Sequence, residues 1–260
     1  MSCLESVKKA CQDLKFEIIV SDSKKEASAE KKIKSRHPDI KYLGFKKNIG
    51  YAGCINKDIK KAQGNYIFII NSDIEVEKDA IKKLKQYIDA HPKIGLLGPK
   101  IIDPDGKPAI SPRRFYKFPW TILARRTFLG KTFLGKRAKS WHLMEDYDRK
   151  KICLVDWILG EAMFTKKEYI DKVGLIDKRF FLYFSDVDWC FRFWEKGLQV
   201  VYYPEALVKE TEATSEATKV RGRGIFSIFT NYLTRKHVSE YIKFLLKHFG
   251  KGNPRKKYAA

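Results

Sequence analysis

Residues 66–76 read YIFIINSDIEV, and this stretch decides the fold class of the 260-residue chain. Its first five residues are continuously apolar, as in a strand that is covered on both faces. The polar residues 71–73 that follow (NSD) end the strand. Strands of this kind belong to parallel sheets flanked by helices, and such sheets bind ligands beyond the carboxyl ends of their strands.

Strands and helices alternate on both sides of this stretch. The alternation predicts an α/β fold with a mainly parallel sheet and helices on its faces. Apolar runs predict further strands at 16–20, 40–45, 94–102 and 198–203. Helices are expected at 4–14, 24–36, 54–64, 77–90, 166–173 and 225–249.

The composition is strongly basic. Lys and Arg number 53 against 31 Asp and Glu, which gives a formal net charge of +22. Such a surplus favours nucleic acid, an anionic membrane surface or phosphorylated small molecules, although much of it can also be solvated surface. No zinc-finger, RNP-type or basic-zipper motif is present, so nucleic acid is not an expected partner.

The sequence predicts a cytoplasmic protein that is either free or peripheral on the inner face of the cell membrane. No apolar run reaches the ~18–20 residues of a membrane-spanning helix. Residues 1–15 lack the apolar core of a secretory signal. The five cysteines are scattered and form no C-x-x-C pair, so we expect buried free thiols.

The first candidate for chemistry is Asp73, which follows the buried strand at 66–70. A carboxylate there can bind Mg²⁺ or Mn²⁺, hard cations that prefer oxygen ligands and bridge phosphates. The alternative is that Ser72 or Asp73 forms an Asx turn or a helix cap. Asp22 lies in the equivalent place, after the strand at 16–20.

A pair of acidic residues, Asp186 and Asp188, lies inside the aromatic stretch 180–194 (FFLYFSDVDWCFRFW). A carboxylate among aromatic side chains acquires a raised pKa, which suits a base that deprotonates a sugar hydroxyl. The alternative is that these residues cap a helix. Further upstream, Gly160 interrupts the apolar run 153–165, where it permits close approach of a ligand or forms a bulge.

These motifs, in this order, resemble glycosyltransferase family 2, whose members have the GT-A fold and use nucleotide-sugar donors. The resemblance points to the rhamnosyltransferase-like bacterial branch that builds cell-surface polysaccharides. It covers most of the chain, and its most specific part is the block 156–206. The matching segments are EIIVSDSK at 17–24, NIGYAGCIN at 48–56, AQGNYIFIINSDIEV at 62–76, the block 156–206 and SIFTNYLTRKH at 227–237.

The resemblance implies a role for each matching residue. Asp186 resembles the catalytic base of a direct displacement with inversion. Asp73 resembles the metal-binding acid, with Glu210 as a further ligand of Mg²⁺ or Mn²⁺. The residues implied to bind the nucleotide-sugar, a dTDP- or UDP-linked donor, are Asp22, Asn48, Gly50, Asn56, Asn71 and Ser72. Those implied to meet the acceptor or the sugar are Trp157, Gly160, Glu161 and Asp188.

The chain departs from the family pattern in several places. Asn71 replaces the first acid of the usual D-x-D, Ser185 replaces the Glu before the base, and Glu210 lies where many members carry a His. The family's first, central strand has no counterpart. Either the start of the gene is misassigned, or strands 16–20 and 66–70 pair directly, or another segment fills the slot, because unpaired buried backbone is costly.

We predict a GT-A-like catalytic domain over 1–215 and a basic helical extension over 216–260. The extension and the segment 113–139 are both basic and aromatic, which fits peripheral contact with an anionic membrane; packing on the catalytic domain is the alternative. The expected activity is metal-dependent transfer of a sugar, rhamnose by the resemblance, to a glycan or polyprenyl-linked acceptor. The alternative is a non-catalytic relative that binds a nucleotide or a partner.

Overall fold

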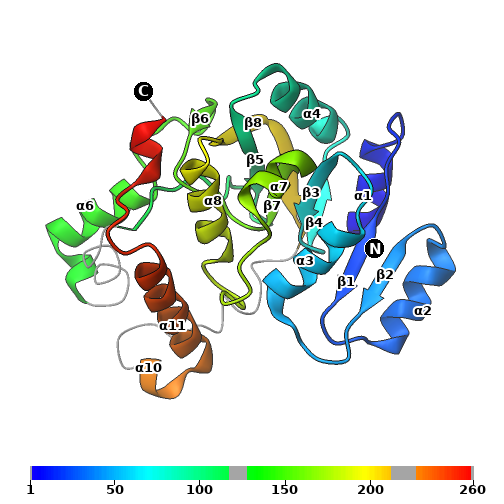
Figure 1. Cartoon of the computed structure of the whole chain (residues 1–260), viewed down its shortest axis with the longest axis horizontal. Helices are drawn as coiled ribbons and strands as arrows, with labels where there is room; N and C mark the ends of the chain where they lie inside the picture. Colours follow the sequence, from blue (N-terminus) through cyan, green and yellow to red (C-terminus); the bar gives the residue numbers. More distant parts are fainter. Residues whose placement is uncertain (1, 117–127, 212–226, 259–260) are drawn as a thin grey trace.

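The computed structural model describes residues 2–116, 128–211 and 227–258. The start of the predicted extension (216–226) and part of the basic segment 113–139 lie outside the described residues. In Figure 1 the first elements of the chain lie at one end of the longest axis, and the C-terminal helices lie at the other.

A six-stranded sheet forms the centre of the fold, in the order β3-β7-β5-β8-β4, with β6 paired to β8. Only β5 and β8 pair in parallel in this sheet; β1 and β2 form a separate parallel pair. The α/β class is confirmed, but the prediction of a mainly parallel sheet is wrong, because apolar patterning does not encode strand direction. The strands are β1 (Ile19–Asp22), β2 (Lys41–Gly44), β3 (Tyr66–Ile70), β4 (Ile74–Val76), β5 (Ile94–Ile102), β6 (Cys153–Leu154), β7 (Ala162–Lys166) and β8 (Gln199–Glu210).

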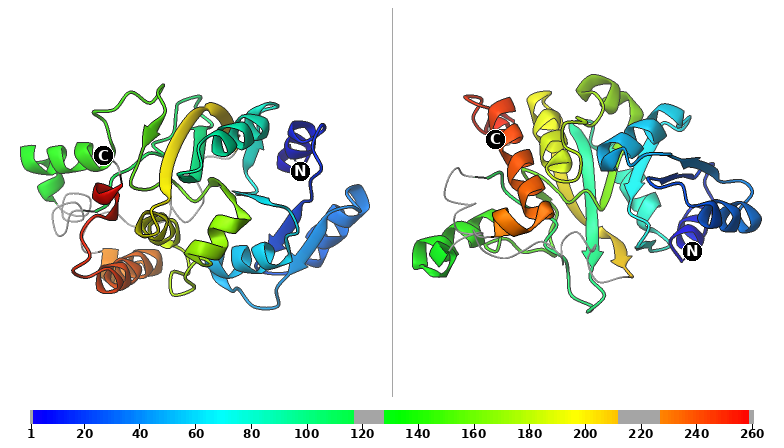
Figure 2. Two further views of the ribbon diagram at one scale, coloured as in Figure 1. Left: turned by 45° about the horizontal axis from the view of Figure 1, so that its top comes forward. Right: turned by 90° about the horizontal axis from the view of Figure 1, so that it is seen from below.

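Helices flank this sheet (Figures 1 and 2). α4 and α8 both pack on β5 and β8, α7 packs on β7, and α1 packs on β4. The helices expected at 4–14, 24–36, 54–64, 77–90 and 166–173 are present with shifted ends, the single helix expected at 225–249 is divided into α10 and α11, and α6 lies in a segment for which no helix was predicted. The helices are α1 (Ser2–Ala10), α2 (Ala27–Arg36), α3 (Gly50–Lys61), α4 (Ala80–Ala90), α6 (Phe133–His142), α7 (Lys167–Val173), α8 (Ser185–Glu195), α10 (Ser227–Thr230) and α11 (Tyr232–Lys247), with short 3₁₀ turns η1 (Phe128–Lys131) and η2 (Pro254–Lys257).

The core is built around the aromatic residues of α8. Trp189, Phe193 and Trp194 are fully buried. The Trp194 indole N–H donates to the Val155 carbonyl at 3.0 Å, so the helix is fixed by a directional bond as well as by packing. Burial of each such side chain contributes roughly 1.5–3 kcal/mol. All five cysteines are free, as expected.

The described strands form two separate sheets. In the part of the chain that the structure describes, β1 pairs with β2 alone and β3 pairs with β7 alone, so direct pairing of β1 with β3 is contradicted. Within the described residues no strand joins the two sheets. The β1–β2 layer is instead tied to the body through α3, where the Ser21 hydroxyl donates to the Asp58 carboxylate.

Strand β8 is longer than expected. The sequence predicts its end at Tyr203, before Pro204, but the strand continues to Glu210. The pairing of β8 with β5 shifts register between Tyr203 and Leu207, opposite Pro99 and Lys100. Pro204 lies in this irregular stretch, so its missing N–H removes no hydrogen bond between the strands. The additional part of β8 ends at Glu210, which lies opposite Ile74, the first residue of β4.

Candidate functional site

The end of β3 lies against the start of β7. Ile70 is paired with Ala162, and the Asn71 N–H donates to the Glu161 carbonyl at 3.0 Å, which extends the ladder by one residue. The segment before β7, which includes Gly160, is thereby held beside the polar residues that follow β3.

The pairing of β4 with β8 brings two acidic residues, Asp73 and Glu210, to this edge of the sheet. Ile74 of β4 lies opposite Glu210 of β8. The Thr211 N–H and hydroxyl both donate to the Asp73 carbonyl, at 2.8 Å and 3.0 Å. Asp73, directly before β4, and Glu210, at the end of the adjacent strand β8, are therefore close together although they are 137 positions apart in the chain.

The electrostatics place Glu161 in the same cluster of acids. Burial, reinforced by the charges of Glu210 and Asp73, raises the pKa of Glu161 to about 7. The positive charge of Arg113 opposes this rise. Glu161, Glu210 and Asp73 therefore form a cluster of acidic groups at this end of the sheet, and the cluster is only partly exposed to water.

Asp186 lies in the first turn of α8. Its Oδ2 accepts the Gly160 N–H at 3.1 Å, and its Oδ1 accepts the Val187 N–H at 2.9 Å. Asp186 is half-buried as a residue, and burial of its carboxyl raises the pKa above the ordinary aspartate value. Two residues before Asp186, Phe184 has a left-handed backbone conformation (φ 60°) that turns the chain sharply into the helix.

The segment 160–161 connects the two groups of acids. Gly160 donates to the Asp186 carboxylate, and the carbonyl of its neighbour Glu161 accepts from Asn71. The charges of both Asp73 and Asp186 act on Glu161. Asp73 and Asp186 therefore both lie within electrostatic reach of Glu161.

Two of the side chains expected to bind the nucleotide, Asp22 and Asn48, accept hydrogen bonds from nearby groups of the protein. Asp22 accepts hydrogen bonds from the N–H groups of Lys24 and Glu26, each at 2.9 Å, and from the Tyr42 hydroxyl, and that hydroxyl bond is the main cause of its lowered pKa. Asn48 accepts from the Gly50 N–H at 2.9 Å at the start of α3.

Gly50 itself has φ +73°, and a Cβ atom there would come within 2.7 Å of the Phe181 carbonyl. A glycine is required at this contact. Ser72 is exposed beside Asp73.

Three of the predicted site residues lie in the interior instead. The Asn56 side chain bridges the N–H and carbonyl of Ile176, and the Trp157 indole donates to the Arg114 carbonyl. Both side chains, and that of Asp188, are almost fully buried. Their sequence context cannot show this, because the groups that satisfy them come from distant segments.

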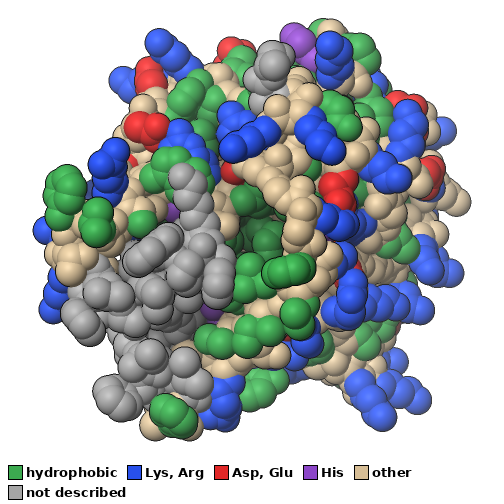
Figure 3. All heavy atoms as spheres, turned by 60° about the vertical axis from the view of Figure 1, so that its left-hand side comes forward, with side chains coloured by type: hydrophobic (Ala, Val, Ile, Leu, Met, Phe, Trp, Pro, Cys, Tyr) green, Lys and Arg blue, Asp and Glu red, His purple; other side chains and the backbone are tan. Residues whose placement is uncertain are grey.

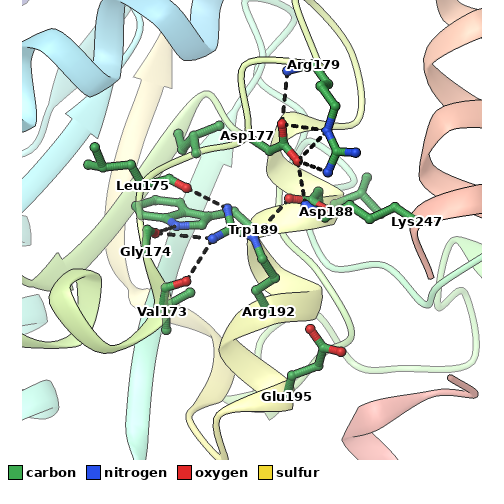
Figure 4. Close-up of polar contacts among 12 residues, drawn as sticks. Val173, Gly174, Leu175, Asp177, Arg179, Asp188, Trp189, Arg192, Glu195 and Lys247 are labelled. Atoms are coloured by element: carbon green, nitrogen blue, oxygen red, sulfur yellow. Dashed lines mark hydrogen bonds and ion pairs between the residues drawn. The ribbon is translucent and has the colours of Figure 1, made fainter.

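Asp188 belongs to an ion-pair network (Figure 4). One of its oxygens lies 3.0 Å from Arg192 Nε, and the other lies 2.7 Å from Lys247 Nζ and 2.8 Å from His248 Nε2. Lys247 also pairs with Asp177 at 2.7 Å. The network ties α11 to α8, and both oxygens of the Asp188 carboxylate are engaged in it.

We expect Lys247→Met to lower the free energy of unfolding at pH 7 by about 1–2 kcal/mol, because it removes one shared partner of two carboxylates. Burial alone raises the pKa of Asp188, but hydrogen bonding to His248 and the charges of Arg192 and Lys247 hold it below the ordinary value. Stability from a lowered carboxyl pKa is present above about pH 4 and is lost as the pH falls through the folded-state pKa.

The difference between the wild type and Lys247→Met should therefore shrink below about pH 4 in urea unfolding. The matched control is Lys251→Met, which removes the more exposed pair with Glu195 and should cost under about 0.5 kcal/mol. Equal costs for the two variants would contradict the assignment of Lys247 to a buried network.

Sequence reasoning missed two residues that border the acids. The Tyr51 hydroxyl donates to the Gly160 carbonyl, and burial raises its pKa well above 10. Arg113 lies over the Trp157 ring, with its guanidinium carbon 5.2 Å from the ring centroid. Tyr51 is part of NIGYAGCIN, but neither a lone tyrosine nor one arginine among many in a basic segment carries a distinctive signal.

The acids at this edge fit a divalent cation. Asp73 and Glu210 offer carboxylate oxygens, the ligands that Mg²⁺ and Mn²⁺ prefer. Among the described residues no three acidic, histidine or cysteine side chains form a ready-made metal cage. One or two carboxylates suffice where the phosphates of a substrate complete the coordination.

The family model for glycosyl transferase family 2 matches residues 2–157, well over half of the chain. The chain belongs to glycosyl transferase family 2. Over 242 residues it is 26% identical to an N-acetylglucosaminyl-diphospho-decaprenol L-rhamnosyltransferase of Mycobacterium tuberculosis, covering 83% of this chain and 70% of the relative. It is also 25% identical to the low-salt glycan biosynthesis hexosyltransferase Agl10 of Haloferax volcanii, over 68% of this chain and 52% of the relative.

Solved structures confirm the GT-A fold of this family 2 member. GalNAc-T7, solved with UDP, GalNAc and Mn²⁺, aligns with a TM-score of 0.59 at 14% identity. The mannosyltransferase PcManGT of Pyrobaculum calidifontis, solved with GDP-Man and Mn²⁺, aligns with a TM-score of 0.53 at 17% identity. They cover 99% and 92% of this chain, which spans 55% and 59% of their lengths. The protein is a rhamnosyltransferase-like glycosyltransferase.

Proposed function

We propose that this protein transfers rhamnose from a dTDP-linked, or otherwise UDP-linked, donor to a lipid-linked glycan acceptor with inversion at the sugar. The observation that carries the proposal is the convergence of Asp73 and Asp186 on the segment 160–161. The rhamnosyltransferase of Mycobacterium tuberculosis, whose name specifies a decaprenol-linked acceptor, supports the choice of sugar and acceptor.

Asp186 acts as the general base in this proposal. Its raised pKa makes it a stronger proton acceptor than an ordinary aspartate. The Gly160 N–H fixes the orientation of the carboxylate. Gly160 and Glu161 form the wall against which the acceptor and the transferred sugar lie.

Asp73 and Glu210 would hold Mg²⁺ or Mn²⁺, which when bound neutralises the charge of the departing diphosphate. Asn71 and Ser72 flank Asp73 and face the same side of the donor. Asp22, Asn48 and Gly50 line the nucleoside end. Asn56, Trp157 and Asp188 keep only an indirect part, because their side chains are held in the interior.

The proposal is tested by incubating the protein with dTDP-rhamnose, a polyprenyl-diphosphate-linked N-acetylglucosamine and Mn²⁺. Release of dTDP together with formation of a disaccharide-lipid supports it. UDP-glucose and GDP-mannose serve as comparison donors. Binding of nucleotide without turnover on any of these donors would overturn the enzymatic proposal and favour a non-catalytic relative.

The C-terminal extension offers a surface for the membrane that carries such an acceptor. α11 has two apolar faces: Tyr241 and Phe244 are buried in the core, whereas the opposite face is exposed. That second face, here called the outer stripe, includes Phe229 of α10 (78% exposed) and Leu246 (72% exposed). The members of the outer stripe are Phe229, Tyr232, Ile242, Leu246 and Phe249.

Basic residues surround the outer stripe. Arg235, Lys243 and Lys251 are exposed in α11 or just after it, and Figure 3 shows more Lys and Arg than Asp and Glu on the face that it draws. Apolar side chains among cations fit an anionic lipid surface. No helix in the described part of the chain is long and apolar enough to cross a membrane. We therefore propose peripheral attachment at the inner face of the cell membrane, which combines both alternatives for the extension.

We expect replacement of Phe229, Leu246 and Phe249 by serine to reduce flotation with phosphatidylglycerol-containing vesicles about tenfold, because the apolar area available for insertion falls. Phe16→Ser is the matched control, since Phe16 is an exposed aromatic residue that precedes β1 and lies outside the C-terminal helices. Flotation of the triple variant equal to that of the control would contradict membrane contact through the outer stripe.

A further inference from the structure

A buried carboxylate on α11 binds three consecutive backbone N–H groups. Glu240 is fully buried. Its Oε1 accepts the Phe181 N–H at 3.0 Å, and its Oε2 accepts the N–H groups of Leu182 and Tyr183 at 3.2 Å and 2.6 Å. Successive N–H groups of this kind form a concave binding site for an anion, and here the anion is supplied by the C-terminal helix.

The loop held in this way leads directly to the proposed base. It runs from Asp177 to Phe184, and α8 begins with Ser185 and Asp186. α11 fastens both ends of the loop as well, because Lys247 pairs with Asp177 and with Asp188. The Phe184 ring packs between the rings of Tyr241 and Phe244, which lie on the same inner face of α11 as Glu240.

A continuous set of contacts leads from the loop to the wall of the site. The Phe181 carbonyl accepts the Tyr51 N–H at 3.0 Å. The Tyr51 hydroxyl donates to the Gly160 carbonyl, and the Gly160 N–H donates to Asp186. Asp186 is therefore positioned from two directions, through the start of α8 and through Gly160, and both begin at the three N–H groups that Glu240 binds.

We propose that Glu240 is a positioning residue for the catalytic base. It holds the loop 181–183 so that Asp186 and Gly160 keep their mutual orientation, and the C-terminal helix is thereby part of the active site. This inference rests on the proposed glycosyl transfer, because it assigns Asp186 the role of base. A displacement of the base by about 1 Å is enough to lower turnover strongly.

The test compares Glu240→Gln with Glu168→Gln, an exposed glutamate on α7. Glutamine has nearly the same shape, but its amide group presents N–H donors to the N–H groups of the loop and carries no charge. We expect Glu240→Gln to lower kcat about tenfold or more while KM for the donor changes less than about twofold, because the Glu240 carboxylate bonds the loop that leads to Asp186 and none of the residues placed at the nucleoside end. Glu168→Gln should match the wild type.

Hydrogen exchange gives a second readout that does not depend on turnover. Amides 181–183 should lose protection in Glu240→Gln, whereas those of β5 and β8 should keep theirs. Unchanged protection at 181–183 would overturn the inference even if no sugar transfer is found. Absence of transfer by the wild type, with protection lost as expected, would instead overturn the proposed function.

A double-mutant cycle with Tyr51→Phe separates positioning from general loosening. Tyr51 lies on one of the two routes that begin at the loop bound by Glu240, so adding Tyr51→Phe to Glu240→Gln should lower turnover little beyond Glu240→Gln alone. Effects on kcat that multiply would overturn the inference. Glu240→Asp, which keeps the charge but is shorter, replaces Glu240→Gln if that variant does not fold.

Discussion

Asp186→Asn should lower sugar transfer by about 10²–10⁴-fold, because an amide cannot take the proton of the acceptor hydroxyl. The change is nearly isosteric, and the amide oxygen can still accept the Gly160 N–H. Affinity for the nucleoside diphosphate should stay within about twofold of the wild type, since a general base acts only in the transition state. Turnover is measured as nucleoside diphosphate release and affinity by calorimetry.

The wild-type pH profile checks the same assignment. Because burial raises the pKa of Asp186, kcat should fall on the acid side at a pH above the ordinary aspartate value of 3.8. The matched control is Asp171→Asn, an exposed position on α7. Should Asp186→Asn retain wild-type turnover, or lose nucleotide affinity together with turnover, the role of general base would be untenable.

Asp73→Ala should reduce turnover by about 10³-fold at a fixed Mn²⁺ concentration, because stabilisation of the diphosphate by a bound cation contributes several kcal/mol. Glu210, on the neighbouring strand, remains as a carboxylate donor. Raising the Mn²⁺ concentration should therefore recover part of the activity. The measurement is a titration of activity against Mn²⁺ for the wild type and the variant.

The control for this change is Asp79→Ala, since Asp79 precedes α4, is exposed and makes no capping bond through its side chain. Full activity of the wild type in the presence of a chelator would exclude a metal at Asp73. A titration curve for Asp73→Ala that coincides with that of Asp79→Ala would also contradict the proposed ligand.

Local patterns predicted the elements that carry the site. The apolar run at 66–70 followed by polar residues located both the strand and the acid behind it, and the aromatic stretch around Asp186 became a buried helix. These predictions hold because each depends on neighbours in the chain. The family likeness was also visible in short motifs, and the family match bears it out.

What the sequence did not predict depends on distant partners. Pro204 indicated the end of a strand, but a register shift against β5 accommodates it. Asp188 is two residues from Asp186 and shares its aromatic surroundings, yet its partner Lys247 comes from the far end of the chain. Glu240 belongs to no recognisable motif, because the three groups that donate hydrogen bonds to it are backbone N–H groups, which occur in any sequence.

The two-faced character of α11 has a mechanical consequence. A helix of this kind is a stiff rod, so its inner and outer sides cannot shift independently. Lipid that holds the outer stripe in place would add its restraint to Glu240 and thus to the loop 181–183. Membrane binding and the positioning of Asp186 would then be coupled. By thermodynamic reciprocity, an occupied active site would strengthen membrane binding by the same factor.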